Sequence, residues 1–271
     1  MRNTITFDDV LLEPQYSEVV SRKSIDISSK LSENIVLELP IIAAPMDTVT
    51  NSYVLSEMNN HGATGVLHRY NPVYEQVSKL KRIKGTKAAA IGVTGDYLER
   101  AMKLVQAGAE ILCVDVAHGH HALVRHALKT LRNTLGHSIH IMAGNVATLK
   151  AFNDLADWGA NSIRVGIGGG SICSTRIQTG HGIPTLQSVI DCSRTDRDAK
   201  LIADGGIKNS GDMVKALAAG ADFVMAGSLL AGTLESPGEI INISDKQYKK
   251  YRGMASVEAQ IDWRGHSSSN E

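Results

Sequence analysis

Residues 107–115 read Ala107-Gly108-Ala109-Glu110-Ile111-Leu112-Cys113-Val114-Asp115, in which a Gly-Ala pair is followed at once by a short apolar run. A glycine suits the left-handed end of a helix, and a continuous apolar run is typical of a strand buried on both faces of a parallel sheet. Close variants of this phrase recur at residues 61–67, 158–165 and 219–226. Each copy predicts a helix that ends where a buried strand begins.

Further apolar runs at 41–44, 87–91, 140–143 and 201–203 bring the number of predicted strands to eight. Amphipathic patterns predict helices over residues 52–60, 74–83, 97–106, 122–135, 149–157, 183–192 and 210–219. Eight βα repeats favour a (β/α)8 TIM barrel over an open doubly wound sheet. We expect one domain over residues 1–271, in which 240–271 form a flap and a mobile C-terminal tail and 247–260 are partly helical.

Composition excludes several classes of protein. The chain has 271 residues with 28 Lys and Arg against 28 Asp and Glu, so no net field attracts nucleic acid or an anionic membrane. Its three cysteines, Cys113, Cys173 and Cys192, form no CxxC pair, which argues against a disulfide framework and a zinc site. No signal peptide or membrane-spanning run is visible, which predicts a soluble cytoplasmic protein.

In a barrel of this type the groups that follow each strand converge on one face. Asp115, Asn145 and Asp204 occupy such positions, and the two aspartates are candidates to bind hydroxyl groups of a sugar or cofactor. Helix N-caps are the alternative interpretation for both. The histidines at 118, 120 and 121 have a spacing that makes a zinc site improbable.

The turn after the sixth predicted strand carries a cysteine among glycines. It reads Gly166-Ile167-Gly168-Gly169-Gly170-Ser171-Ile172-Cys173-Ser174-Thr175. Glycines let backbone N–H groups converge on an anion, which predicts a nucleophilic thiol beside a phosphate-bearing substrate. A small buried cysteine in a tight turn is the alternative.

Gly205-Gly206 and Gly227-Ser228 follow the seventh and eighth strands, where many barrels bind phosphate through backbone amides. Ser171 can add a hydroxyl group to this site. Plain tight turns are the alternative interpretation.

Six motifs together resemble the inosine monophosphate dehydrogenase and guanosine monophosphate reductase family. They are Thr6-Phe7-Asp8-Asp9-Val10-Leu11-Leu12-Glu13-Pro14, Ala44-Pro45-Met46-Asp47-Thr48-Val49-Thr50, Ala143-Gly144-Asn145-Val146-Ala147-Thr148, Gly170-Ser171-Ile172-Cys173, Ala203-Asp204-Gly205-Gly206-Ile207 and Tyr251-Arg252-Gly253-Met254-Ala255-Ser256. The resemblance implies that Cys173 attacks C2 of inosine monophosphate and that a hydride passes to NAD. Hydrolysis of the thioimidate then yields xanthosine monophosphate.

The resemblance also assigns roles to individual residues. Ser171, Gly206, Gly227, Ser228 and Tyr251 hold the phosphate, Asp204 the ribose, and Met254 and Ala255 the base. Gly205 and Gly253 also belong to the substrate-binding set. Asp115, Asn145, Arg164 and Gly166 form the cofactor side, Thr175 assists proton transfer, and Arg264 is a weak candidate for the water-activating base. Carbonyl groups of Gly168, Gly170 and Cys173 correspond to a potassium site, and a homotetramer is the usual assembly.

Two alternatives to the dehydrogenase stay open. The first is a guanosine monophosphate reductase, which expels ammonia with NADPH, and the second is a barrel that binds purine nucleotides without turnover. The chain departs from the family pattern because residues 79–87 run straight on where the dehydrogenases usually carry a regulatory CBS insert. The family's segment after the flap has no counterpart after Glu271, so either the chain is a fragment or a further part is not included.

Overall fold

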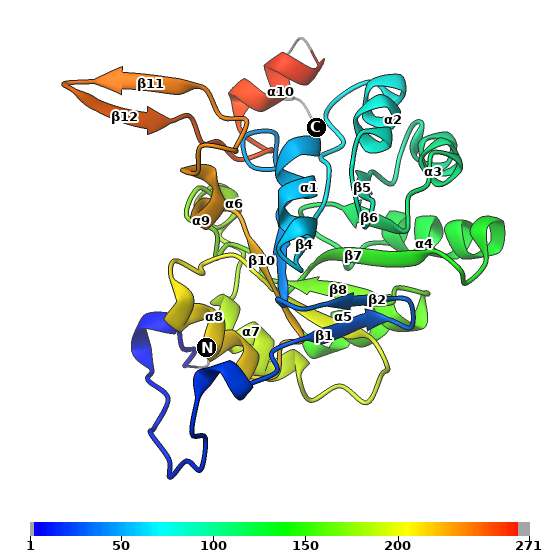
Figure 1. Cartoon of the computed structure of the whole chain (residues 1–271). Coiled ribbons are helices and arrows are strands. Elements are labelled where there is room, and N and C mark those ends of the chain that lie inside the picture. Colours follow the sequence, from blue (N-terminus) through cyan, green and yellow to red (C-terminus); the bar gives the residue numbers. More distant parts are fainter. Residues whose placement is uncertain (1–2, 265–271) are drawn as a thin grey trace.

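The structure, a computed structural model, describes residues 3–264; the side chains of residues 260 and 264 are not described. Eight parallel strands form one sheet in the order β4-β3-β10-β9-β8-β7-β6-β5 (Figure 1). Their bounds are β3 Ile41–Ala43, β4 Thr64–Gly65, β5 Ala88–Ile91, β6 Ile111–Asp115, β7 His140–Val146, β8 Ser162–Val165, β9 Lys200–Asp204 and β10 Phe223–Ala226. All eight predicted strands are present.

The two edge strands of this sheet, β4 and β5, meet through a single parallel bridge between Leu67 and Ala89. The amide of Leu67 donates to the carbonyl of Ala88 at 3.0 Å, and the amide of Ala90 donates to the carbonyl of Leu67 at 2.8 Å. These bonds close the sheet, and the predicted (β/α)8 barrel is confirmed.

The helices lie where the amphipathic patterns predict them. They are α1 Ser52–Asn60, α2 Val73–Lys81, α3 Tyr97–Gln106, α4 Ala122–Leu135, α5 Leu149–Asp157, α7 Thr185–Cys192 and α8 Ser210–Ala218. The side chains of Asn51, Thr148 and Asn209 cap α1, α5 and α8 by accepting hydrogen bonds from free helix amides. Two short helices were not predicted, α6 Thr175–Thr179 and α9 Ser228–Ala231.

The inside of the barrel is filled by aliphatic side chains and closed at its base by a hairpin. Strands β1 Ser29–Ser32 and β2 Ile35–Leu37 pair antiparallel, and Leu31, Ile35 and Leu37 join the cluster that contains Ile42 and Met142. A larger cluster fills the layer between the strands and the surrounding helices. Side chains therefore close the amino-terminal end of the barrel, and the carboxyl ends of the strands form its open face.

The segment after β10 differs from the sequence expectation. Residues 240–249 form a hairpin, with β11 Ile240–Ile243 and β12 Lys246–Lys249 joined by Ser244 and Asp245 (Figure 1). Both turn residues have positive φ, 45° and 64°, as a two-residue hairpin turn requires. The predicted partial helix over 247–260 is present from residue 257 on, in α10 Val257–Arg264, whereas residues 247–249 belong to β12. The predicted mobile tail falls, from residue 265 on, outside the described residues.

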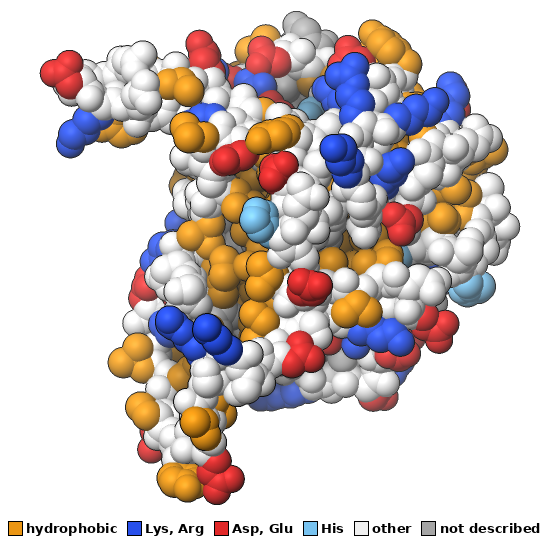
Figure 2. Space-filling model, viewed as in Figure 1, with side chains coloured by type: hydrophobic (Ala, Val, Ile, Leu, Met, Phe, Trp, Pro, Cys, Tyr) orange, Lys and Arg blue, Asp and Glu red, His pale blue; other side chains and the backbone are white. Residues whose placement is uncertain are grey.

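Among residues 3–264, no helix combines the length and the apolar character needed to cross a bilayer. Positive and negative side chains are mixed over most of the face shown in Figure 2, although Lys and Arg gather over α2. Apolar side chains line a hollow near the centre of this face.

Candidate active site

A buried charge network joins the carboxyl ends of β6, β7, β8 and β9. Arg164 on β8 donates to Oδ1 of Asp115 at 2.5 Å and to Oδ2 of Asp204 at 2.9 Å. Asn145 donates from Nδ2 to the same Asp204 oxygen at 2.7 Å and to the carbonyl of Gly166 at 2.9 Å. The network fixes both carboxylate groups at the barrel mouth, so neither aspartate is the helix cap that was the alternative interpretation.

Arg164 itself lies below the surface, since only 8% of its side chain is exposed against 17% for Asp115 and 16% for Asp204. Burial alone lowers the pKa of a guanidinium group, but the facing carboxylates of Asp204 and Asp115 outweigh it and hold the pKa of Arg164 well above its usual range. Arg164 therefore stays charged and positions the two aspartates.

The cysteine loop and the Gly205-Gly206 turn pack backbone against backbone. A Cβ on Gly205 would lie 3.0 Å from the amide nitrogen of Gly170, and a Cβ on Gly206 would lie 3.0 Å from the carbonyl oxygen of Gly169. Gly205 and Gly206 also have positive φ, 96° and 78°. These glycines are required because two main-chain segments approach each other without room for side chains.

Cys173 differs from the other two free cysteines in its surroundings. Cys113 and Cys192 are buried, and burial raises the pKa of each thiol to about 12, so both stay protonated and unreactive. Cys173 is half-buried, two residues before α6 begins at Thr175. Its amide donates to the carbonyl of Gly170 at 3.1 Å, which folds the loop tip into a turn. The structure thus leaves one sulfur within reach of a ligand.

Tyr251 reaches back over the barrel mouth from the segment that follows β12. Burial raises the pKa of its phenol, a hydrogen bond with Ser171 opposes this, and the charge of Asp204 adds to the rise. The phenol oxygen also lies 3.1 Å from the position a Cβ on Gly227 would take. The structure thus brings together Tyr251, Ser171 and Gly227, three of the residues assigned to the phosphate, and Tyr251 remains a donor at neutral pH.

The same segment is held to the barrel by contacts that the sequence did not reveal. Arg252 donates from Nε and Nη2 to Oδ2 of Asp47, at 3.0 and 2.5 Å, and from Nη1 to Asp262 of α10 at 2.5 Å. The amide of Asp47 in turn donates to the sulfur of Met254 at 3.3 Å. Asp47 follows β3, so its position at a strand end was the signal that pointed to it.

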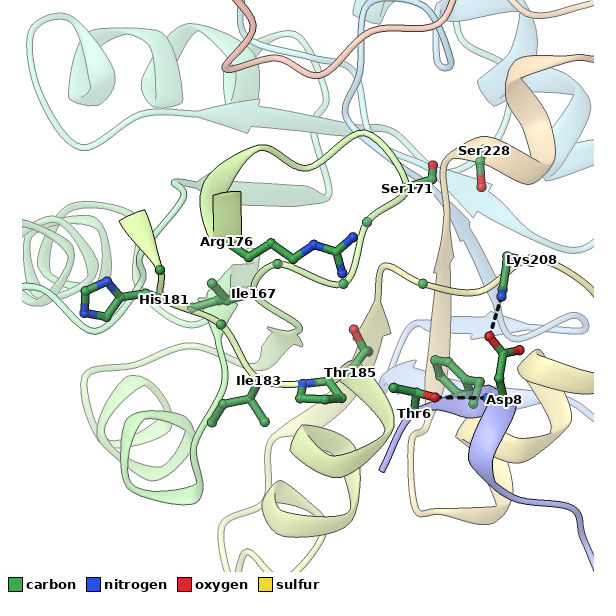
Figure 3. A pocket seen from close by; sticks show the side chains of 18 residues that line it. Thr6, Asp8, Ile167, Ser171, Arg176, His181, Ile183, Thr185, Lys208 and Ser228 are labelled. Carbon is green, nitrogen blue, oxygen red and sulfur yellow. Dashed lines mark hydrogen bonds and ion pairs between the residues drawn. The ribbon is translucent and has the colours of Figure 1, made fainter. Parts of the chain in front are cut away.

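A cavity of about 510 Å³ opens beside these groups (Figure 3). Ser171, Gly206 and Ser228 form part of its wall, whereas Cys173, Asp204 and Tyr251 do not line it. The cavity therefore adjoins the predicted phosphate site, and the thiol is not part of its wall. The remaining walls come from residues 6–8, from residues 167–170 of the cysteine loop, from residues 180–185 at the start of α7, and from Arg176 and Lys208.

Comparison with known proteins shows which family the chain belongs to. The sequence profile described as the IMP dehydrogenase / GMP reductase domain matches residues 4–270. The chain belongs to the IMP dehydrogenase / GMP reductase family. It is 38% identical to an inosine-5'-monophosphate dehydrogenase of Cryptosporidium parvum, covering 96% of this chain and 76% of that protein. It is 32% identical to a GMP reductase of Leishmania major, covering 95% and 80%.

A crystal structure of inosine 5' monophosphate dehydrogenase from Legionella pneumophila has the same fold. It shares 49% identity and a TM-score of 0.88, covering 99% of this chain and 84% of that one. The alignment with the dehydrogenase of Nitrosopumilus maritimus, 31% identical, runs over 388 positions against 271 residues here. That family member carries residues that this chain lacks. Here α2 ends at Lys81 and β5 begins at Ala88, which leaves no room for the CBS insert.

In the histidine cluster at 118–121, where the sequence makes a zinc site improbable, His120 lies away from the barrel mouth. His120 hydrogen-bonds with Asp154 at 2.7 Å and stacks on Trp158, on the outer surface between α4 and α5. Within residues 3–264, no group of three or more His, Cys, Asp or Glu side chains is arranged to hold a metal ion. The side chain of Arg264, the weak candidate base, lies outside the described residues.

Proposed function

We propose that the protein oxidises inosine 5'-monophosphate to xanthosine 5'-monophosphate, with Cys173 as the nucleophile. The observation that carries this proposal is that the one accessible thiol, Cys173, belongs to a loop that packs on the Gly205-Gly206 turn and whose Ser171 hydrogen-bonds with Tyr251. Family membership and the relatives named as dehydrogenases support it. The protein is an oxidoreductase.

The chemistry divides into two steps that share one covalent bond. The sulfur of Cys173 adds to C2 of the purine, and the C2 hydrogen leaves as a hydride with its electron pair. NAD, when bound, accepts this hydride. Water then attacks C2 of the resulting thioimidate, and the thiol leaves with a proton to regenerate Cys173. Thr175, two residues further on, is proposed to assist the proton transfer, and Arg264 remains the proposed candidate base.

The substrate residues are proposed from their positions around the thiol. The phosphate would accept hydrogen bonds from Ser171, Ser228, Tyr251 and the backbone at Gly205, Gly206 and Gly227. Asp204 would bind the ribose hydroxyl groups. Gly253, Met254 and Ala255 would contact the base, because a Cβ on Gly253 would lie 3.3 Å from the carbonyl oxygen of Ile172, next to Cys173.

The cofactor side would be formed by Asp115, Asn145 and Gly166. Among the described residues, the second oxygen of Asp115 and Oδ1 of Asn145 have no hydrogen-bond partner, so both fit the donors of a carboxamide or a ribose. Arg164 would act through the two aspartates that it positions. Carbonyl groups of Gly168, Gly170 and Cys173 would hold potassium. The Gly170 carbonyl already accepts one hydrogen bond, but its second lone pair leaves room for a cation.

The remaining features of the proposal concern the whole protein. We propose a single catalytic domain in which residues 240–271 serve as the flap, a homotetramer, and a cytoplasmic location, which three free cysteines favour. Nucleic acid is not a proposed partner.

Guanosine monophosphate reductase is the second candidate, because the family includes reductases that match this chain at 32% identity. Purified protein is given inosine monophosphate with NAD, and separately guanosine monophosphate with NADPH, while absorbance at the reduced nicotinamide band is followed. We expect turnover in the first assay. Turnover in the second alone identifies a reductase, and binding of both nucleotides without turnover identifies a non-catalytic barrel.

A further inference from the structure

A buried side chain on α2 reinforces the junction at which the barrel closes. The backbones of β4 and β5 meet there at the bridge between Leu67 and Ala89. The side-chain amide of Gln76, which is fully buried, donates from Nε2 to the carbonyl of Ala90 at 2.8 Å and to the carbonyl of His68 at 3.1 Å. Both carbonyl groups belong to residues directly after the bridge, so Gln76 extends the pairing from one strand end to the other.

Gln76 is held in this orientation by a buried arginine on α3, the helix beside α2 (Figure 1). Arg100 donates from Nη1 to Oε1 of Gln76 at 2.8 Å and to the carbonyl of Asn71 at 3.0 Å. A guanidinium group can only donate, so the oxygen of the Gln76 amide faces Arg100 and its nitrogen faces the two strand carbonyls. Asp96 binds Nη2 of the same guanidinium group at 2.9 Å. These contacts fix the loop of residues 68–72 to both helices.

The 68–72 loop carries Arg69 to the cofactor side of the barrel mouth. Nε of Arg69 donates to the main-chain carbonyl of Asp115, the last residue of β6, at 3.2 Å. Nη1 lies 3.4 Å from the position that a Cβ on Gly92, directly after β5, would take. Asp115 is therefore held at two points, because Arg164 binds its carboxylate and Arg69 binds its carbonyl.

We propose that Gln76 is a positioning residue for the cofactor half of the active site. It fixes the main chain at His68, which aims Arg69 at the carbonyl of Asp115. The inference rests on the proposed function, in which Asp115 belongs to the cofactor side. The proposed phosphate loops follow β8, β9 and β10, whereas the junction that Gln76 bridges lies between β4 and β5, next to β6. Loss of this bridge therefore weakens cofactor binding more than nucleotide binding.

Steady-state kinetics with NAD and inosine 5'-monophosphate varied in turn test the proposal. Gln76→Glu keeps the oxygen that accepts from Arg100 but replaces the donating nitrogen by an oxygen, which repels the two carbonyl groups. We expect the KM for NAD to rise by about tenfold, and the KM for inosine monophosphate and kcat to change by less than about threefold. Gln106→Glu makes the same change at an exposed position of α3 and, as the matched control, should alter none of these values.

A double-mutant cycle tests whether Gln76 acts through Arg69. Arg69→Ala should raise the KM for NAD by a similar factor, and the double variant should raise it no further than the larger single effect, because residues that act through one another are not additive. Effects that multiply in the double variant would overturn the proposal. If Gln76→Glu does not fold, an unchanged KM for NAD in Arg69→Ala, whose side chain is half-buried, overturns it as well.

Two outcomes with Gln76→Glu also decide against a positioning role. An equal rise in the KM values for NAD and inosine monophosphate would mean that the barrel loosens as a whole. An unchanged KM for NAD, in a protein that turns over, defeats this inference and leaves the proposed function standing. If the unmodified protein does not turn over with inosine monophosphate and NAD, the proposed function fails and this inference fails with it.

Discussion

Arg252 and Asp47, 205 positions apart in the sequence, form a bidentate contact in which Nε and Nη2 both reach Oδ2, at 3.0 and 2.5 Å. Their side chains are 16% and 19% exposed, so water screens the pair only partly. The contact makes the placement of Tyr251 and Met254 depend on the loop after β3. Asp47 Oδ1 is buried without a partner among the described residues, so the pair is not fully satisfied.

Breaking this contact should affect substrate binding more than the chemical step. Arg252→Gln is expected to raise the KM for inosine monophosphate by about tenfold, the effect of losing a partly buried charged contact, while kcat changes less. Arg197→Gln is the control, because its pair with Asp157 is exposed and worth little. Equal KM values for both variants would contradict the positioning role of Arg252.

Cys173 should be the one cysteine that reacts. Iodoacetamide at neutral pH is expected to label Cys173 and spare Cys113 and Cys192, whose thiols are buried with pKa values of about 12. Cys173→Ala should abolish turnover, measured by absorbance, and leave nucleotide binding within about threefold by calorimetry. Normal turnover by Cys173→Ala would exclude the covalent mechanism.

The packing of Thr185 against Gly169 predicts a mutation and its rescue. Gly169→Ala places a Cβ 2.1 Å from Oγ1 of Thr185, which forces the cysteine loop to shift, and activity should fall by at least about tenfold. Adding Thr185→Ala removes the clashing oxygen and should recover most of the activity, whereas Thr185→Ser keeps it and should not. Failure of Thr185→Ala to restore kcat/KM would show that the shift has another origin.

Stability should fall in mild acid because of buried histidines. Burial lowers the pKa of His140 to about 4, and Arg132 adds to the effect, whereas the unfolded chain titrates near 6.5. Between these values the unfolded state binds more protons, so the free energy of unfolding falls by up to roughly 3 kcal/mol as the pH falls from 6.5 to 4. Burial lowers the pKa of His68 to about 4 as well, and it acts in the same direction.

Urea unfolding at pH 7 and pH 5 measures this effect. His140→Gln should lose about half of the difference between the two pH values, because His68 keeps its share. His137→Gln, at an exposed position beyond α4, should retain the whole difference. An unchanged difference in His140→Gln would mean that His140 is not a source of the acid sensitivity.

The repeated Gly-Ala phrases predicted four of the barrel strands and further apolar runs predicted the other four, because helix ends and buried apolar runs are local signals. The strand-end rule likewise placed Asp115, Asn145 and Asp204 at one rim. The sequence does not show which charged side chains pair with each other. Arg164 binds two aspartates from strands on either side of its own strand, and Arg252 binds Asp47, which lies 205 positions away in the sequence. The 240–249 hairpin was missed because its strands are exposed and carry no buried apolar run of the kind that marks the barrel strands.

The single bridge between Leu67 and Ala89 determines where the barrel sheet opens locally. Every other neighbouring pair of strands shares a ladder of two or more residue pairs, so the junction between β4 and β5 is the first place where the cylinder can part. Amide hydrogens of Leu67 and Ala90 should exchange with solvent sooner than those of β7 and β8. Transient opening there would spread apart the early and middle strands while the cysteine loop and its two supporting turns, on the opposite flank, stay assembled.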